Sequence, residues 1–149
     1  MIGTTTRKSM RLTQVLLIES QPNVRRTLSQ FIAHEKDLAV CGEAEDVTHA
    51  MEMPDDVMPD IAVLDLALAD GDGVELAHRI RQRWSSVRII MICACGEALS
   101  CADMVEVGAM GIVSKHEASE QIVEAIRSAM HGHVFCGELV DHAASHWFG

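Results

Sequence analysis

The sequence predicts an α/β fold in which five parallel strands form a sheet with helices on both faces. Two observations support this. Short apolar runs alternate with longer segments of helical periodicity, and the runs contain few polar residues, as strands buried on both faces require. Right-handed crossovers then distribute the helices to either side. The candidate strands are Val15 to Ile18, Leu38 to Cys41, Ile61 to Leu64, Arg88 to Cys93 and Gly111 to Ser114.

The first helix is predicted to open at Pro22, because proline is favoured at the first helical position. Its apolar residues at helical spacing are Val24, Leu28, Phe31 and Ile32, with Arg25, Arg26 and Gln30 outside the stripe. A second, weaker helix runs from about Val47 to Met53 and stops before Pro54.

The third helix follows Gly73. It places Val74, Leu76, Ala77 and Ile80 inward and Arg79, Arg81 and Arg83 outward. The segment from Glu97 to Val107 has little apolar material and is expected to be the least stable helix. The last helix, from about Ser119 to Met130, buries Ile122, Val123, Ile126 and Ala129, with Ser119 as a candidate amino-terminal cap.

Length and composition indicate one domain. The expected organisation is a flexible tail over 1–13, a folded domain over 14–135 and a tail or linker stub over 136–149. A dimer contact is favoured over a linker stub for the apolar residues near the C-terminus, which are Val134, Phe135, Leu139, Val140 and Trp147. The formal charge of -10 argues against direct nucleic-acid binding. With no apolar run near the roughly 20 residues that cross a bilayer, and no secretory signal, we expect a cytoplasmic protein with reduced cysteines.

Three charged residues stand at the ends of predicted strands. Asp65 follows the strand from Ile61, Glu19 follows the first strand and Lys115 follows the last. The carboxyl ends of parallel strands meet at one edge of the sheet, where such folds bind and transform ligands. Asp65 is therefore a candidate nucleophile, with a second acid and an amine beside it.

Several motifs in the same order resemble a bacterial response regulator receiver domain, of the branch that precedes LuxR-type DNA-binding domains. They are VLLIESQPNVRRTL, VLDLALADGDGVEL around Asp65, RIIMICA, VGAMGIVSK ending at Lys115, and HGHVF. The resemblance covers about Gln14 to Phe135 and implies a CheY-like, flavodoxin-like doubly wound sheet.

The resemblance also implies a function. In this family an aspartate at the position of Asp65 accepts a phosphoryl group from a histidine kinase, and the lysine at Lys115 pairs with the carboxylate or the phosphoryl group. In the family a magnesium ion is held by two adjacent acids, by the acceptor and by a backbone carbonyl two residues after it. The positions of the two acids are occupied here by Glu19 and Ser20, and the carbonyl is that of Ala67. The domain is expected to signal through the fourth helix, fifth strand and fifth helix. It is expected not to be an enzyme, beyond self-phosphorylation and self-dephosphorylation.

The chain departs from the family pattern at several positions. Ser20 replaces the second acid, so magnesium binding should be weak. Cys93 replaces the hydroxyl residue that contacts the phosphoryl group, and a thiol is a weak donor. Ile112 replaces the aromatic residue of the fifth strand that usually swings inward in this family. Ala69 replaces the proline commonly seen in the loop after the acceptor. These changes leave open an atypical receiver that works without phosphate, as a docking or adaptor protein.

Other interpretations have less support. A flavodoxin-like enzyme or nucleotide binder would need a glycine-rich phosphate loop, which the sequence lacks. Cys93, Cys95 and Cys101 are potential metal ligands, but core or loop thiols explain them better. The same holds for His131, His133 and Cys136, which a plain helix end with a mobile tail explains better. Asp70 to Gly73 suit a turn and helix start better than a calcium loop.

Overall fold

The computed structural model describes residues 11–68, 71–93 and 108–136. They form the predicted doubly wound sheet, with parallel strands in the order β2-β1-β3-β6-β7-β8. The strands are β1 Thr13–Ile18, β2 Leu38–Ala44, β3 Ile61–Asp65, β6 Arg88–Cys93, β7 Ala109–Ser114 and β8 Phe135–Cys136. The first five strands are the five predicted ones, extended by up to three residues.

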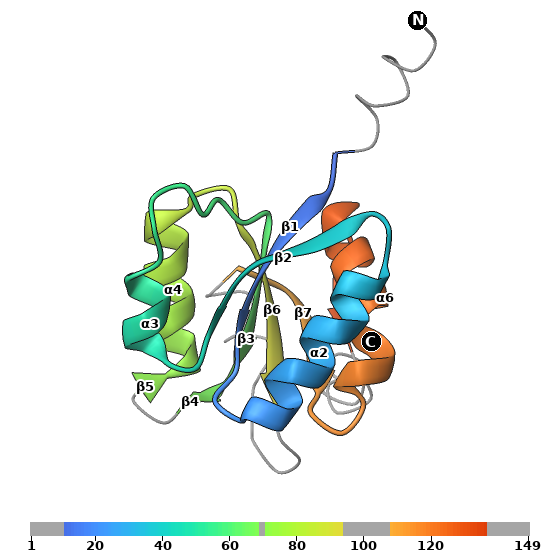
Figure 1. Ribbon diagram of the computed structural model, residues 1–149, viewed down its shortest axis with the longest axis horizontal. Helices are drawn as coiled ribbons and strands as arrows, with labels where there is room; N and C mark the ends of the chain where they lie inside the picture. The colour runs from blue at the N-terminus through green and yellow to red at the C-terminus, as the bar shows by residue number, and fades with distance from the viewer. Residues whose placement is uncertain (1–10, 69–70, 94–107, 137–149) are drawn as a thin grey trace, which may run out of the picture.

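Helices cover both faces of the sheet (Figure 1). They are α2 Pro22–His34, α3 Val47–Met51, α4 Gly73–Arg83 and α6 Ala118–Met130. The apolar core accordingly has two halves: α3 and α4 pack on one side of the central strands, and α2 and α6 pack on the other. Strand β3 is buried along its whole length, because its side chains point alternately into these two halves.

The register of the sheet aligns the carboxyl ends of its central strands. Ile18 lies beside Leu64, Asp65 beside Ile92, and Cys93 beside Ser114. The residues that follow β1 and β7, Glu19 and Lys115, therefore emerge at the same edge as Asp65. This edge lies at the lower end of the strands in Figure 1.

Helix α6 ends in a glycine-centred motif that satisfies its last carbonyl groups. Gly132 has a φ of +79°, which glycine adopts without strain. Its amide donates to the carbonyl of Ala129, and the amide of His133 donates to that of Ser128. The sequence HGH is thus a helix end, as one of the two sequence interpretations held.

Several predicted details are wrong. Ser119 does not cap α6: the cap residue is Glu117, which makes no side-chain capping bond, and Ser119 lies inside the helix. Phe31 is 47% exposed, because the buried stripe of α2 centres on Leu28 and Ile32. Arg83 does not simply face outward, because its guanidinium donates to backbone oxygens at the end of α3. The acceptors are the oxygens of Ala50, Met51 and Met53.

Three short strands add to the five predicted ones. Strands β4 Ala67–Leu68 and β5 Gly71–Asp72 pair antiparallel in the segment after Asp65, and β8 adds a sixth strand beside β7. Pairs of two residues are too short to produce a periodic pattern in the sequence. The helix expected over 97–107, Ala69 and residues 137–149 lie outside the described residues. Of the suggested dimer contact only Val134, which is 58% exposed, and Phe135 are described.

Candidate functional site

The backbone ladder places three charged residues together. Strand β1 continues into Glu19, whose amide donates to the oxygen of Ala44, and β7 continues into Lys115, whose amide donates to the oxygen of Cys93. Asp65 is the last residue of β3, between them. Each side chain therefore enters the edge from a hydrogen-bonded backbone, which fixes where it begins.

Lys115 links the two carboxylates. Its Nζ donates to Asp65 Oδ2 at 3.0 Å and lies 3.3 Å from Glu19 Oε2. The hydroxyl of Ser20 also donates to Asp65 Oδ2, at 3.4 Å. The structure thus brings together Glu19, Ser20, Asp65 and Lys115, four of the five residues whose side chains the sequence placed here; the fifth is Cys93.

Glu19 is fully buried, and its two oxygens differ in environment. Oε2 accepts the amide of Gln21 at 2.8 Å, whereas Oε1 has no hydrogen-bond partner among the described residues. Burial raises the pKa of Glu19 above its usual value, with the nearby charge of Asp65 acting in the same direction. The Gln21 amide and Lys115 oppose this rise without cancelling it.

The pKa of Lys115 is also raised by its surroundings. Burial by itself lowers it, but the hydrogen bond to Asp65 and the charge of Glu19 outweigh burial, so the pKa lies above the ordinary lysine value. Lys115 is consequently a fixed ammonium at neutral pH. It supplies a permanent positive charge beside the Asp65 carboxylate.

The unpartnered oxygen of Glu19 tests whether the residues suit a magnesium ion. A buried acceptor without a donor is costly, and a cation or an ordered water satisfies it. The side chains gathered here offer oxygens, as magnesium prefers: two carboxylates and the Ser20 hydroxyl. However, both carboxylates already contact Lys115. The residues fit a magnesium site that has less negative charge than the family's usual site, because Ser20 replaces one acid and Lys115 offsets another.

The two substituted switch positions are part of the core. Cys93 is 3% exposed and Ile112 is fully buried, and both belong to the half of the core that faces α4. Ile112 lies on β7 between β6 and β8 and is fully buried. It therefore does not provide the inward swing of an aromatic side chain that the family uses at this position.

Arg25 is a site-associated residue that the sequence did not single out. It lies in the first turn of α2, and its Nη1 donates to the backbone oxygen of Glu19 at 2.7 Å. A cation in the first turn opposes the helix dipole, so it needs a specific acceptor. The absence of any acidic residue in that turn was the available signal.

The other predicted metal clusters gain no support. Cys95, Cys101 and Asp70 lie outside the described residues. His131, His133 and Cys136 are described but do not gather around a common point, and the His131 ring nitrogen lies 2.7 Å from the oxygen of Arg127. Histidine hydrogen-bonded to its own helix end is a structural arrangement.

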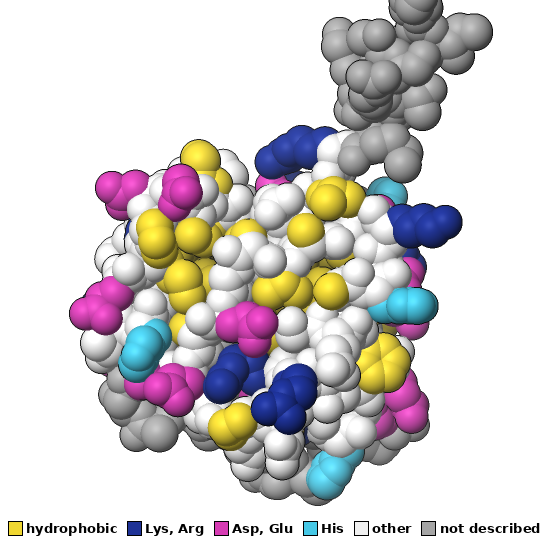
Figure 2. Space-filling model, in the orientation of Figure 1, with side chains coloured by type: hydrophobic (Ala, Val, Ile, Leu, Met, Phe, Trp, Pro, Cys, Tyr) yellow, Lys and Arg dark blue, Asp and Glu magenta, His cyan; other side chains and the backbone are white. Residues whose placement is uncertain are grey.

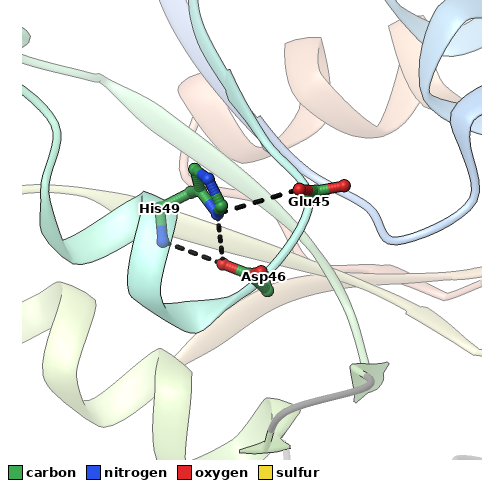
Figure 3. A group of neighbouring side chains, drawn as sticks. All are labelled: Glu45, Asp46 and His49. Carbon is green, nitrogen blue, oxygen red and sulfur yellow. Dashed lines mark hydrogen bonds and ion pairs between the residues drawn. The ribbon is translucent and has the colours of Figure 1, made fainter.

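One exposed group does gather possible ligand atoms, namely Glu45, Asp46 and His49 (Figure 3). Asp46 Oδ1 accepts the His49 amide at 2.9 Å and lies 2.7 Å from His49 Nδ1, while Glu45 Oε1 lies 3.9 Å from Nδ1. Asp46 is the cap of α3, and its contacts are those of a capping residue. The group is explained by helix capping.

This cap makes His49 a pH-dependent contact. The hydrogen bond and charge of Asp46 raise the pKa of His49 above 6.5, so its stabilising contribution is complete below pH 6.5 and is lost as the pH rises through the folded-state pKa. We expect Asp46→Asn to lower the His49 pKa, measured from ring proton shifts in an NMR titration. An unchanged His49 titration in Asp46→Asn would contradict the assignment.

Comparison with known proteins places this arrangement in context. A family model described as the response regulator receiver domain matches residues 15–127. The transcriptional regulatory protein LiaR of Bacillus subtilis is 29% identical over 119 residues, covering 80% of this chain and 56% of that protein. The chemotaxis protein CheY of Listeria monocytogenes is 31% identical over 114 residues, covering 76% of this chain and 96% of CheY.

Solved structures agree with the fold. A two-component response regulator of the LuxR family from Aurantimonas sp. superposes with a TM-score of 0.78 at 25% identity, covering 91% of this chain and 96% of that one. The isolated receiver domain of RcsB from Salmonella enterica gives the same TM-score at 21% identity, covering 89% and 99%. The chain spans about half the length of the transcriptional regulators it matches. No helix in the described segments has the length and apolarity needed to span a lipid bilayer.

Proposed function

The chain belongs to the response regulator receiver domain family, and from this premise we propose that Asp65 accepts a phosphoryl group from a histidine kinase. The observation that carries the proposal is the 3.0 Å bond between Lys115 Nζ and Asp65 Oδ2 at the carboxyl end of the sheet. A carboxylate with a fixed ammonium beside it matches the needs of phosphoryl transfer, where negative charge moves onto the phosphoryl oxygens.

The chemistry uses few residues. An Asp65 oxygen attacks phosphorus, an acyl phosphate bond forms, and the phosphorus–nitrogen bond of the phosphohistidine breaks, its electron pair remaining on the imidazole. Lys115 is placed to pair with a phosphoryl oxygen as its contact with the carboxylate is exchanged. A bound magnesium ion, held by Glu19, Ser20, Asp65 and the Ala67 carbonyl, would neutralise phosphoryl charge. Later attack by water restores the carboxylate.

The proposed output is a change in conformation or dimerisation at the surface of β7, α6 and the helix expected over 97–107. Cys93 and Ile112 weaken the usual route to this surface, because neither supplies a strong hydrogen bond or an exposed aromatic side chain. DNA regulation would follow only through an output domain, such as the one that accounts for the remaining half of the longer relatives.

A phosphate-independent docking role is the second candidate. The specific observation in its favour is that Lys115 already contacts both acids, with Ser20 in place of a third. The ammonium then offsets part of the carboxylate charge without a metal. In this case the domain would bind a kinase or another regulator in its unmodified form.

Phosphorylation of the purified protein tests the two candidates. We expect a phosphoryl adduct by intact mass after incubation with a small acyl phosphate and magnesium, and no adduct for Asp65→Asn, because the amide is not a nucleophile. Circular dichroism of Asp65→Asn controls for folding. A wild-type chain that takes no phosphoryl group at high magnesium concentration would reject phosphoacceptance and favour docking.

A further inference from the structure

The loop that carries Glu19 is held from outside the site by Arg25. Besides its bond to the Glu19 oxygen, the guanidinium places Nε 3.8 Å from Glu43 Oε1 on β2. Ser29 donates to the other oxygen of Glu43, at 3.1 Å. These side chains line a shallow hollow on the surface where basic and acidic groups meet near the start of α2 (Figure 2). Arg25 thus joins α2, β2 and the loop after β1.

The contact with Arg25 completes the anchoring of the Glu19 backbone. The Glu19 amide is bonded to Ala44 on one side, and its carbonyl is bonded to the guanidinium on the other. A charge-assisted bond of 2.7 Å belongs to the stronger class of hydrogen bonds. Both peptide groups flanking the Cα of Glu19 are therefore held, which sets the direction in which its side chain leaves the backbone.

This restraint matters more for glutamate than for aspartate. Glutamate has one more rotatable bond, and fixing that bond costs additional conformational entropy. The Glu19 side chain nevertheless turns back so that Oε2 reaches the Gln21 amide at 2.8 Å and Lys115 Nζ at 3.3 Å. The side chain reaches this position only if its backbone starts in the correct orientation.

We propose that Arg25 is a positioning residue for the phosphoacceptor site, which holds the Glu19 backbone so that the longer carboxylate stays against Lys115. The part of this inference that concerns the magnesium dependence of phosphorylation rests on the proposed function of Asp65. Its structural half, the placement of the Glu19 carboxylate, stands separately, because the Gln21 amide reports directly on Glu19 Oε2.

The test compares Arg25→Met, which keeps the apolar stem, with Arg26→Met, a matched change at the exposed neighbour. In Arg25→Met we expect hydrogen exchange at the Gln21 amide to accelerate about tenfold, since a bond to a charged acceptor is weakened. We also expect the magnesium concentration for half-maximal phosphorylation by a small acyl phosphate to rise severalfold, with little change in the saturating rate. Arg26→Met should match the wild type.

Arg25→Lys separates positioning from general stability. Lysine can donate to the Glu19 oxygen but lacks the planar guanidinium group that also reaches Glu43. We therefore expect Gln21 exchange and the half-maximal magnesium concentration to recover only in part. This variant also serves if Arg25→Met fails to fold. A purely structural role would lower the melting temperature without shifting the half-maximal magnesium concentration.

Two outcomes would decide against the inference. Gln21 exchange in the Arg25 variants equal to that in Arg26→Met would overturn it, whatever the phosphorylation data show. Unaltered magnesium dependence in a chain that is phosphorylated would overturn its link to the reaction. If the wild type takes no phosphoryl group, the proposed function fails, and faster Gln21 exchange in Arg25→Met still establishes that Arg25 positions Glu19.

Discussion

Replacing Lys115 with methionine is expected to lower the free energy of unfolding at pH 7 by about 3 kcal/mol, as removing one partner of a buried ion pair does. The Lys115 ammonium lies within 3.3 Å of Glu19 and 3.0 Å of Asp65, whose side chains are 0% and 2% exposed. Methionine keeps the apolar stem but leaves two neighbouring buried carboxylates without a cation. Urea denaturation of both proteins at several pH values measures the difference.

The pH dependence of this loss identifies its cause. The pKa of Glu19 is already raised, so its stabilising contribution is complete below pH 4.5 and is lost as the pH rises through the raised pKa. Lys115 lowers the pKa of Glu19, so without Lys115 this carboxyl retains its proton to higher pH, and the deficit should shrink as the pH falls toward 4.5. The contribution of Lys115 has the same sign at higher pH: it is present below pH 10.5 and is lost as the pH rises through the raised lysine pKa.

A second substitution provides the control. In Lys115→Met/Glu19→Gln one of the two acids is neutral, so about half or more of the lost stability should return. The single variant Glu19→Gln completes the double-mutant cycle. If the double variant is as unstable as Lys115→Met at pH 7, the loss comes from packing of the lysine stem and the charge argument is wrong.

The sequence predicted the sheet well because buried parallel strands appear as continuous apolar runs. Strand β6 was predicted with its observed bounds, and the inward residues Leu76, Ala77 and Ile80 of α4 are all fully buried. Helix ends were harder, as Ser119 shows. A capping preference is a local tendency worth about 1 kcal/mol, and packing of Ala118 against α2 and the sheet sets the start of α6 instead.

The site was predictable where it depends on strand order and not where it depends on side-chain reach. Asp65 ends β3 and Lys115 follows β7, and these two strands flank β6 in one parallel sheet, so their meeting at its carboxyl edge follows from topology. The contact between Lys115 and Glu19, and the bond from Arg25 to the Glu19 oxygen, depend on rotamers that no periodic pattern encodes. Arg25 was therefore assigned only to the polar side of its helix.

Ser20→Asp is expected to tighten magnesium binding about tenfold or more, equivalent to roughly 1.4 kcal/mol. The Ser20 hydroxyl lies 3.4 Å from Asp65 Oδ2, so an aspartate here adds a third carboxylate where the ion would bind. Stability as a function of magnesium concentration measures the affinity without any phosphorylation, because an ion that binds only the folded chain raises its melting temperature.

Ser20→Asn is the matched control, similar in size to aspartate but uncharged. Without magnesium, Ser20→Asp should be less stable than Ser20→Asn, since three acids then face one lysine; with magnesium the order should reverse. Equal magnesium dependence in the two variants would show that the missing charge does not limit the ion.

The phosphorylation rate of Ser20→Asp then separates the two candidate functions. If tighter magnesium binding also accelerates transfer to Asp65, the serine is the cause of slow chemistry in an otherwise working acceptor. If magnesium binds tightly and transfer stays absent, metal charge is not what the site lacks. The remaining departures, Cys93 without a hydroxyl and the buried Ile112, then favour a receiver that acts through docking of its unmodified form.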